Sequence, residues 1–105
     1  MVRMRNFTHP ALKDVSMAAL LHALGDPARL AFAQGLYCGA ILNCGELSKK
    51  AHDALPPSTV NHHLRIMREA GLIYSERDGV SVKNRLRIDE VEKRFPGLLG
   101  VILKK

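Results

Sequence analysis

The sequence predicts a mainly helical domain with one small β-hairpin. Apolar residues recur at helical spacing through most of the chain. The spacing changes to the alternation of strands only in residues 72–77 and 81–88, and Asp78-Gly79 between them is a strong hairpin signal. Helical spacing returns after residue 88. The predicted order is therefore four helices, two strands and a last helix.

Length and charge are those of one small basic domain. The chain has 105 residues, is 47% hydrophobic, and carries a formal net charge of +6. Such a charge favours an acidic partner, of which nucleic acid is the commonest and an anionic membrane surface the next. No apolar run approaches the roughly 20 residues that span a bilayer, and the N-terminus has no signal-peptide core. We therefore expect a cytoplasmic protein and no membrane partner.

The first half of the chain begins with a basic, irregular stretch. Residues 1–10 are expected to form a flexible arm ahead of a domain of residues 11–105. A first helix is predicted over 11–24. A second begins at Asp26, a good N-cap, because Pro27 then occupies the first helical position, where a missing amide costs nothing. It should end near Gly39, and residues 40–42 are consistent with a stub of strand.

A short helix, a turn and a longer helix follow. The short helix is predicted over 45–52 with Asn43 or Cys44 as its cap, and the longer one over 58–70 with Ser58 as its cap. Gly71 can adopt the left-handed conformation that ends a helix. This order is a helix-turn-helix.

The longer helix has two distinct faces. Val60, Leu64 and Met67 form a buried stripe. Asn61, His62, Arg65 and Arg68 gather opposite it and combine hydrogen-bonding groups with positive charge, as a helix in a DNA major groove requires. An ordinary solvated face has a similar composition, and it is the neighbouring elements that favour DNA.

The hairpin is the first of those neighbours. Residues 72–88 hold four basic residues, Arg77, Lys83, Arg85 and Arg87. A basic hairpin directly after a helix-turn-helix is a wing, suited to phosphates or a minor groove.

The tail from residue 89 carries an apolar stripe that includes Val91, Phe95 and Ile102. Pro96 pushes Phe95 away from the helical region, so a break is expected there. The stripe has little left to pack against within one subunit. We therefore expect it to be buried against the first helix and a second copy of the chain.

Three motifs in this order resemble the ArsR/SmtB-type winged-helix repressors of bacteria. Leu24–Leu30 (LGDPARL) is similar to that family's L-x-D-P-x-R-L signature. Ser58–Leu64 (STVNHHL) is similar to its S-x-V-S-H-x-L recognition helix, and Arg68–Ile73 (REAGLI) to its R-x-A-G-L-V passage into the wing. The likeness covers residues 12–103.

The resemblance implies a homodimer, built on the first and last helices, that occupies double-stranded operator DNA until an inducer binds. It implies DNA contacts from Ser58, Asn61 and His62. Thr59, which is next to Ser58, is also expected to contact DNA, and the polar face of the helix adds Arg65. The expected phosphate contacts are Lys49, Lys50, Arg77, Lys83 and Arg85. Asn61 departs from the family's usual Ser and can pair bidentately with adenine. The turn before Ser58 is about two residues longer than is usual. The inducer is unknown.

The family's metal sites have no counterpart in this sequence. Where a thiolate site would read C-x-C-D-L, residues 43–47 read Asn-Cys-Gly-Glu-Leu. The other usual site needs Asp, His and Glu on the last helix, and residues 89–105 contain no His. We therefore expect neither a metal nor any other cofactor.

Two alternatives stay open beside a DNA-binding regulator. Cys38 and Cys44 could gate DNA binding by oxidation, with Cys44 the more reactive because it lies near a helix N-terminus. The simpler interpretation is that both cysteines are small side chains in or near the core, without a redox role. A winged-helix protein-interaction module without specific DNA binding is the second alternative. An enzyme is not expected, because the chain has no phosphate loop, nucleophile motif or carboxylate pair.

Overall fold

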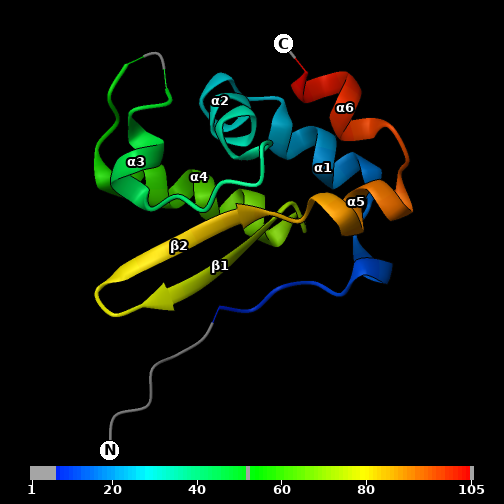
Figure 1. The fold of residues 1–105 in the computed structure, drawn as a ribbon, viewed down its shortest axis with the longest axis horizontal. Coiled ribbons are helices and arrows are strands. Elements are labelled where there is room, and N and C mark those ends of the chain that lie inside the picture. Colours follow the sequence, from blue (N-terminus) through cyan, green and yellow to red (C-terminus); the bar gives the residue numbers. More distant parts are fainter. Residues whose placement is uncertain (1–6, 52, 105) are drawn as a thin grey trace, which may run out of the picture.

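A computed structural model describes residues 7–51 and 53–104. It has the predicted fold class, with helices gathered on one side of a two-stranded hairpin (Figure 1). The elements in order are the 3-10 helix η1 (Leu12–Asp14), α1 (Met17–Leu24), α2 (Pro27–Leu36), α3 (Cys44–Ser48), α4 (Pro57–Glu69), β1 (Ile73–Asp78), β2 (Ser81–Leu86), α5 (Ile88–Arg94) and α6 (Leu98–Leu103). None of the described helices is long and apolar enough to cross a membrane.

The first helix is shorter than predicted. Residues 12–14 form one 3-10 turn, Val15 is extended and buried, and α1 begins only after Ser16, whose hydroxyl accepts from the amide of Ala19. Ser is a strong N-cap and stabilises an interruption that the apolar spacing alone did not reveal. The continuous helix over 11–24 was therefore wrong in its first turn.

The second helix begins as predicted. The Asp26 side chain accepts from the amides of Ala28 and Arg29, with Pro27 in the first turn. The helix ends at Leu36, earlier than the expected Gly39. Leu42 then makes an isolated antiparallel bridge with Asn84, so the expected stub pairs with the free edge of β2.

The caps of the next two helices differ in how well they were predicted. Asn43 caps α3 in a capping box, since its side chain accepts from the amide of Glu46 and the Glu46 carboxylate accepts from the amide of Asn43. The helix ends at Ser48, short of the predicted residue 52. Ser58 does not cap α4, because Pro56 occupies the N-cap position and Pro57 the first turn, which shifts the start by one residue.

The hairpin has the predicted alternation. Tyr74 pairs with Arg85 and Glu76 with Lys83, while Gly79, at φ +64°, lies in the two-residue turn between Asp78 and Ser81. The strands end at Leu86, so residues 87–88 do not belong to β2.

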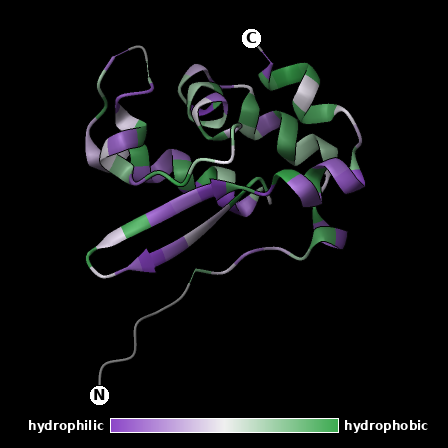
Figure 2. Cartoon of the chain, viewed as in Figure 1, coloured by the Kyte–Doolittle hydropathy of each residue, from purple (hydrophilic) through white to green (hydrophobic). Residues whose placement is uncertain are grey.

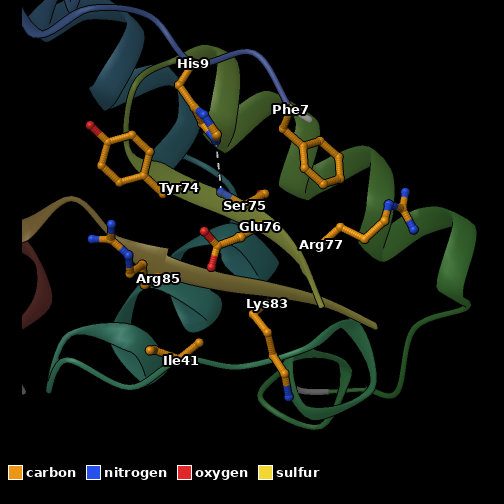
Figure 3. Close-up of a pocket in the computed structure, with 9 residues that line it drawn as sticks. All are labelled: Phe7, His9, Ile41, Tyr74, Ser75, Glu76, Arg77, Lys83 and Arg85. Carbon is orange, nitrogen blue, oxygen red and sulfur yellow. Dashed lines mark hydrogen bonds between the residues drawn. The ribbon is translucent and has the colours of Figure 1, made fainter. Parts of the chain in front are cut away.

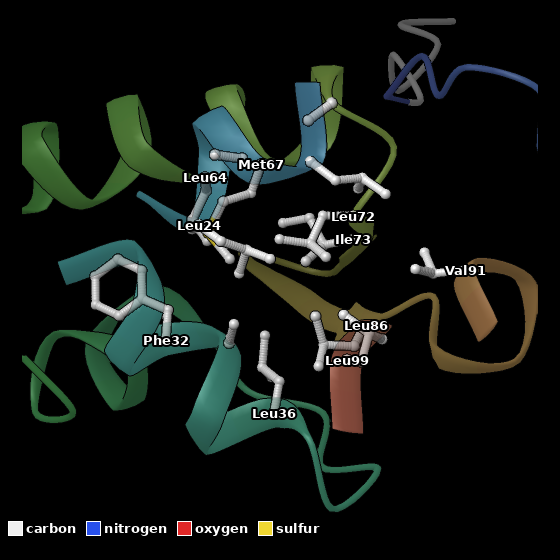
Figure 4. Packing of buried hydrophobic residues seen from close by; sticks show 14 of the residues in the cluster. Leu24, Phe32, Leu36, Leu64, Met67, Leu72, Ile73, Leu86, Val91 and Leu99 are labelled. Carbon is white, nitrogen blue, oxygen red and sulfur yellow. The ribbon is translucent and has the colours of Figure 1, made fainter. Parts of the chain in front are cut away.

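The core lies between the helices and the base of the hairpin (Figure 4). Val60, Leu64 and Met67 of α4 are buried, as their spacing predicted. They pack with side chains from the other helices, from the hairpin and from the segment that joins α4 to β1, including Leu24, Phe32, Leu36, Leu72, Ile73 and Leu86. The inner face of α4 is thus fixed, and its polar face is turned outward.

The C-terminal stripe is packed more fully within one chain than expected. The break at Pro96 is confirmed, because α5 ends at Arg94 and α6 begins at Leu98. Val91, Leu99 and Leu103 are buried in the subunit's own core, where α6 contacts α2. The prediction that this stripe lacks partners in its own chain was therefore wrong. Most of α6 is apolar (Figure 2). Its exposed large apolar side chain is Val101.

Candidate nucleic-acid interface

A polar groove of about 680 Å³ runs between α4 and the hairpin. Its walls are made by Ser58, Asn61, His62, Leu64, Arg65 and Arg68 from α4, by Arg77 and Val82 from the hairpin, and by Phe7. Ser58, Asn61, His62 and Arg65 are exposed, whereas Thr59 is half-buried. The structure thus brings five of the ten predicted DNA-contacting residues, these four and Arg77, into one groove.

The other five do not line this groove. Thr59 is half-buried on α4, and the remaining four basic residues lie elsewhere. Lys83 and Arg85 line a neighbouring cavity on the face of the hairpin, together with Tyr74 and Glu76 (Figure 3). Phe7 and Arg77 line both this cavity and the groove. Lys49 is exposed at the end of α3. The aliphatic stem of Lys50 lies over Gly35 of α2. A Cβ added to Gly35 would lie 3.1 Å from the nearest carbon atoms of that stem.

Buried polar side chains join α4 to the hairpin. Arg68 donates to the Ser75 hydroxyl (3.0 Å), which donates to the Asn84 side chain (2.7 Å), whose amide donates to the Leu42 carbonyl (3.1 Å). Ser75 and Asn84 are buried. Because buried polar groups are costly unless paired, this chain of bonds fixes the hairpin's orientation relative to the helices.

A second buried contact orients α4 from the opposite side. Arg29 is 8% exposed, and it donates to the Ala23 carbonyl (2.7 Å) and contacts Nδ1 of His63 (3.0 Å). Arginine has only donors, so Nδ1 must accept and the His63 ring is neutral with its proton on Nε2. Burial, reinforced by the Arg29 charge and opposed by Asp26, lowers the pKa of His63. His63 is therefore structural, as its place on the apolar side of the helix predicted.

The described part of the N-terminal arm lies against the hairpin. His9 accepts through Nε2 from the Ser75 amide (2.9 Å), as the dashed line in Figure 3 shows. Its ring meets Tyr74 edge-on, with centroids 4.9 Å apart. Arg87 donates to the Pro10 carbonyl (2.9 Å). Residues 1–6 of the predicted arm lie outside the described part of the chain.

Two residues of this region were missed as site residues. Arg68 was assigned to the polar face of its helix but not to a contact, and the helical spacing was the signal that could have found it. Phe7 lies in the groove with its ring centroid 4.3 Å from the Arg68 guanidinium carbon. No periodic pattern includes Phe7, so the sequence held no signal for it.

The cysteines differ in exposure. Cys38 is exposed, and Cys44 is half-buried in the first turn of α3. Burial raises the pKa of the Cys44 thiol, which opposes the lowering expected from the helix N-terminus. Among residues 7–51 and 53–104, no three His, Cys, Asp or Glu side chains gather as a metal site would require.

Two histidines make folding sensitive to pH. Burial lowers the pKa of His9, as does the charge of Arg68, and the pKa of His63 is also below its usual 6.5. The unfolded chain therefore binds more protons than the folded chain near that pH. The contribution of the two neutral histidines to the free energy of unfolding is thus fully present above pH 6.5 and is lost as the pH falls below it. We expect the midpoint of urea unfolding to decrease between pH 7.5 and 5.

Substitutions that keep a hydrogen-bond acceptor but cannot titrate test this pH dependence. His9→Gln and His63→Asn keep an oxygen where each ring nitrogen accepts, and together they should flatten this part of the pH profile. His22→Asn, at an exposed position, is the matched control. An unchanged profile in the double variant would assign the pH dependence to other groups.

Comparison with known proteins agrees with this architecture. A family model described as a helix-turn-helix domain matches residues 24–76. The chain is 34% identical over 90 residues to the uncharacterized HTH-type transcriptional regulator YceK of Bacillus subtilis, covering 85% of this chain and 88% of that protein.

Solved structures share the fold. Reduced HlyU from Vibrio cholerae superposes with a TM-score of 0.65 at 27% identity, over 84% of this chain and 88% of HlyU. The transcriptional repressor PagR of Bacillus anthracis has a TM-score of 0.59 at 28% identity, over 81% of this chain and 86% of PagR. The chain therefore belongs to the helix-turn-helix transcriptional regulators, of the ArsR type that its motifs resemble, and not to an enzyme family.

Proposed function

We propose that the protein is a dimeric repressor that reads operator DNA with α4 in the major groove. The hairpin contacts the backbone or minor groove beside it. The observation that carries the proposal is the groove itself, where exposed Ser58, Asn61, His62 and Arg65 lie beside Arg77 of the wing. Amide, imidazole and guanidinium groups are donors and acceptors that match base edges and phosphates.

The dimer and the repressor role have separate support. The first and last α-helices both expose apolar side chains. These are Met17 and Leu21 of α1 and Val101 of α6. Burial of these side chains against a second copy would remove apolar surface from water. The similarity to PagR, which is a transcriptional repressor, favours repression over activation.

Selection from a random duplex library tests the proposal without assuming the operator. A dimer with one α4 in each of two major grooves should recover an inverted repeat whose half-sites lie about one helical turn apart. Sedimentation of the complex should then give two chains per duplex. Recovery of a single half-site with one chain bound would contradict the dimeric arrangement.

Arg65→Ala should weaken binding to the selected duplex by about 1–3 kcal/mol, because Arg65 is exposed in the groove and within the reach of bases or phosphates. Fluorescence anisotropy measures the loss. Lys93→Ala, which removes one exposed charge from α5, is the control and should change affinity little. Equal affinity of Arg65→Ala and wild type would remove Arg65 from the interface.

Thiol gating is a second candidate, because Cys38 is exposed and Cys44 is half-buried near it in sequence. If it operates, operator affinity differs between reduced and oxidised protein, and Cys44→Ser abolishes the difference. The same oxidative response in wild type and Cys44→Ser would dismiss a role for Cys44, and Cys38→Ser separates the two thiols.

A further inference from the structure

Two arginines, one from α4 and one from β1, flank one aromatic ring at the groove, and a third arginine lines the same cavities. The guanidinium carbon of Arg68 lies 4.3 Å from the centroid of Phe7, and that of Arg77 lies 5.9 Å from it. Arg65, one turn before Arg68 on α4, lines the same two adjoining cavities as Phe7 and the other arginines. Residues from an α-helix, a strand and the N-terminal segment therefore converge on one place.

Among residues 7–51 and 53–104, no ion pair within 4.0 Å offsets this concentration of positive charge. In the part of the chain that the structure describes, the salt bridge within 4.0 Å joins Arg87 to Glu90 and involves none of the three arginines. Glu69 lines the outer cavity and acts on Arg68 only through its charge. Like charges held together repel unless an anion binds between them, so the cluster is suited to a negatively charged ligand.

The head of Arg68 is held in place, and its donors are only partly used. One Nη donates to the Ser75 hydroxyl at 3.0 Å, and the Phe7 ring covers the guanidinium face. Among the described residues, its other N–H groups have no protein acceptor. A fixed guanidinium with free donors is pre-organised for phosphate, whose oxygens it can bind in pairs.

We infer that Arg65, Arg68 and Arg77, positioned by Phe7, form a binding site for a single phosphate group. The source of this phosphate rests on the proposed function. In the proposed complex it is one phosphate of the DNA backbone, which lies between the wing and the major groove that α4 contacts. Phe7 lies outside the helix-turn-helix match of residues 24–76. It acts as a positioning residue that holds two guanidinium groups through its π face.

The first test uses a random-sequence duplex and the salt dependence of its affinity. Arg68→Gln should reduce the slope of log K against log salt by about 0.9, the contribution of one phosphate contact. Phe7→Leu keeps the apolar volume and should weaken binding about two- to fivefold. Phe7→Tyr keeps the ring and should restore it. Lys93→Gln on α5 is the charge-matched control and should leave the slope unchanged.

The second test uses inorganic phosphate alone, at constant ionic strength. In wild type, the Nε–Hε resonances of the three arginines should shift saturably as phosphate replaces chloride. The same resonances should shift less in Phe7→Leu and recover in Phe7→Tyr. Far-UV circular dichroism establishes that each variant is folded, so a lost response is local to the site.

The outcomes separate this site from the proposed function. If wild type binds no duplex but the arginine resonances respond to phosphate, the site binds a free anion and the operator proposal fails. If wild type binds its selected duplex while Arg68→Gln and Phe7→Leu keep the full salt slope and affinity, the regulator stands and the phosphate site is overturned. A phosphate response equal in wild type and Phe7→Leu would overturn the positioning role of Phe7.

Discussion

Arg29→Ala is expected to lower the free energy of unfolding by about 2–4 kcal/mol, because the buried guanidinium makes charged hydrogen bonds that alanine cannot replace. Arg29 donates to the Ala23 carbonyl and to His63, and so it joins α1, α2 and α4. Removal of the Arg29 side chain leaves the Ala23 carbonyl without the donor that it has in the wild type. Urea unfolding at fixed protein concentration measures the loss as a lower midpoint at unchanged slope.

The matched control for this variant is another arginine that donates to a backbone carbonyl. Arg94 donates to Leu12, but it is exposed. Arg94→Ala should therefore cost less than about 1 kcal/mol. Arg29→Lys keeps the charge but lacks the fork that reaches two acceptors, so it should recover only part of the loss. A cost for Arg29→Ala no larger than for Arg94→Ala would show that the buried contact contributes little.

Gly71→Ala should destabilise the fold by about 2–5 kcal/mol for two separate reasons. Gly71 ends α4 at φ +85°, where a side chain costs about 1–2 kcal/mol. A Cβ there would also lie 2.3 Å from Cγ2 of Val15, which is 2% exposed. The β-branched Val15 has few alternative rotamers, so overpacking adds roughly 1–3 kcal/mol. Thermal and urea unfolding measure the total.

Gly79→Ala separates the two contributions. Gly79 also has a positive φ, +64°, but an added Cβ there meets nothing within 4 Å. It should show the backbone cost alone. In a double-mutant cycle, Val15→Ala should relieve part of the Gly71→Ala penalty, because it removes the clashing methyl groups. Strictly additive effects of the two substitutions would contradict the predicted clash.

Local signals in the sequence predicted most of the fold. Asp26 with Pro27, Asn43, Gly71 and Pro96 each act through their own backbone or the next few residues, so each marks a helix end without knowledge of the tertiary structure. The misplaced helix starts have the same local origin. At Ser16 the cap interrupted an apolar pattern that continues ahead of it, and the cap determined the boundary. At α4 two local signals competed, and the helix begins at Pro57, which fits the first turn, rather than with Ser58 as its cap.

The site was predicted less completely because its contacts join distant parts of the chain. His9 and Ser75 are 66 residues apart, and Arg29 and His63 are 34 apart. Periodicity assigns a residue to a face but does not say which remote residue meets that face. Asn61, His62 and Arg65 were therefore placed on the exposed side of α4 from spacing alone, whereas the contribution of Phe7 needed the structure.

The central claim is that the exposed face of α4 reads a DNA sequence. The most direct measurement is a fluorescence-anisotropy titration of the reduced protein, at one salt concentration, against the selected duplex, the DNA upstream of its own gene, and a scrambled duplex of equal composition. We predict binding to the selected duplex about a thousandfold tighter than to the scrambled one, with tight binding to the upstream DNA if the regulator controls itself. Equal binding to all three that disappears at physiological salt would contradict the claim and favour a winged-helix module that binds another protein.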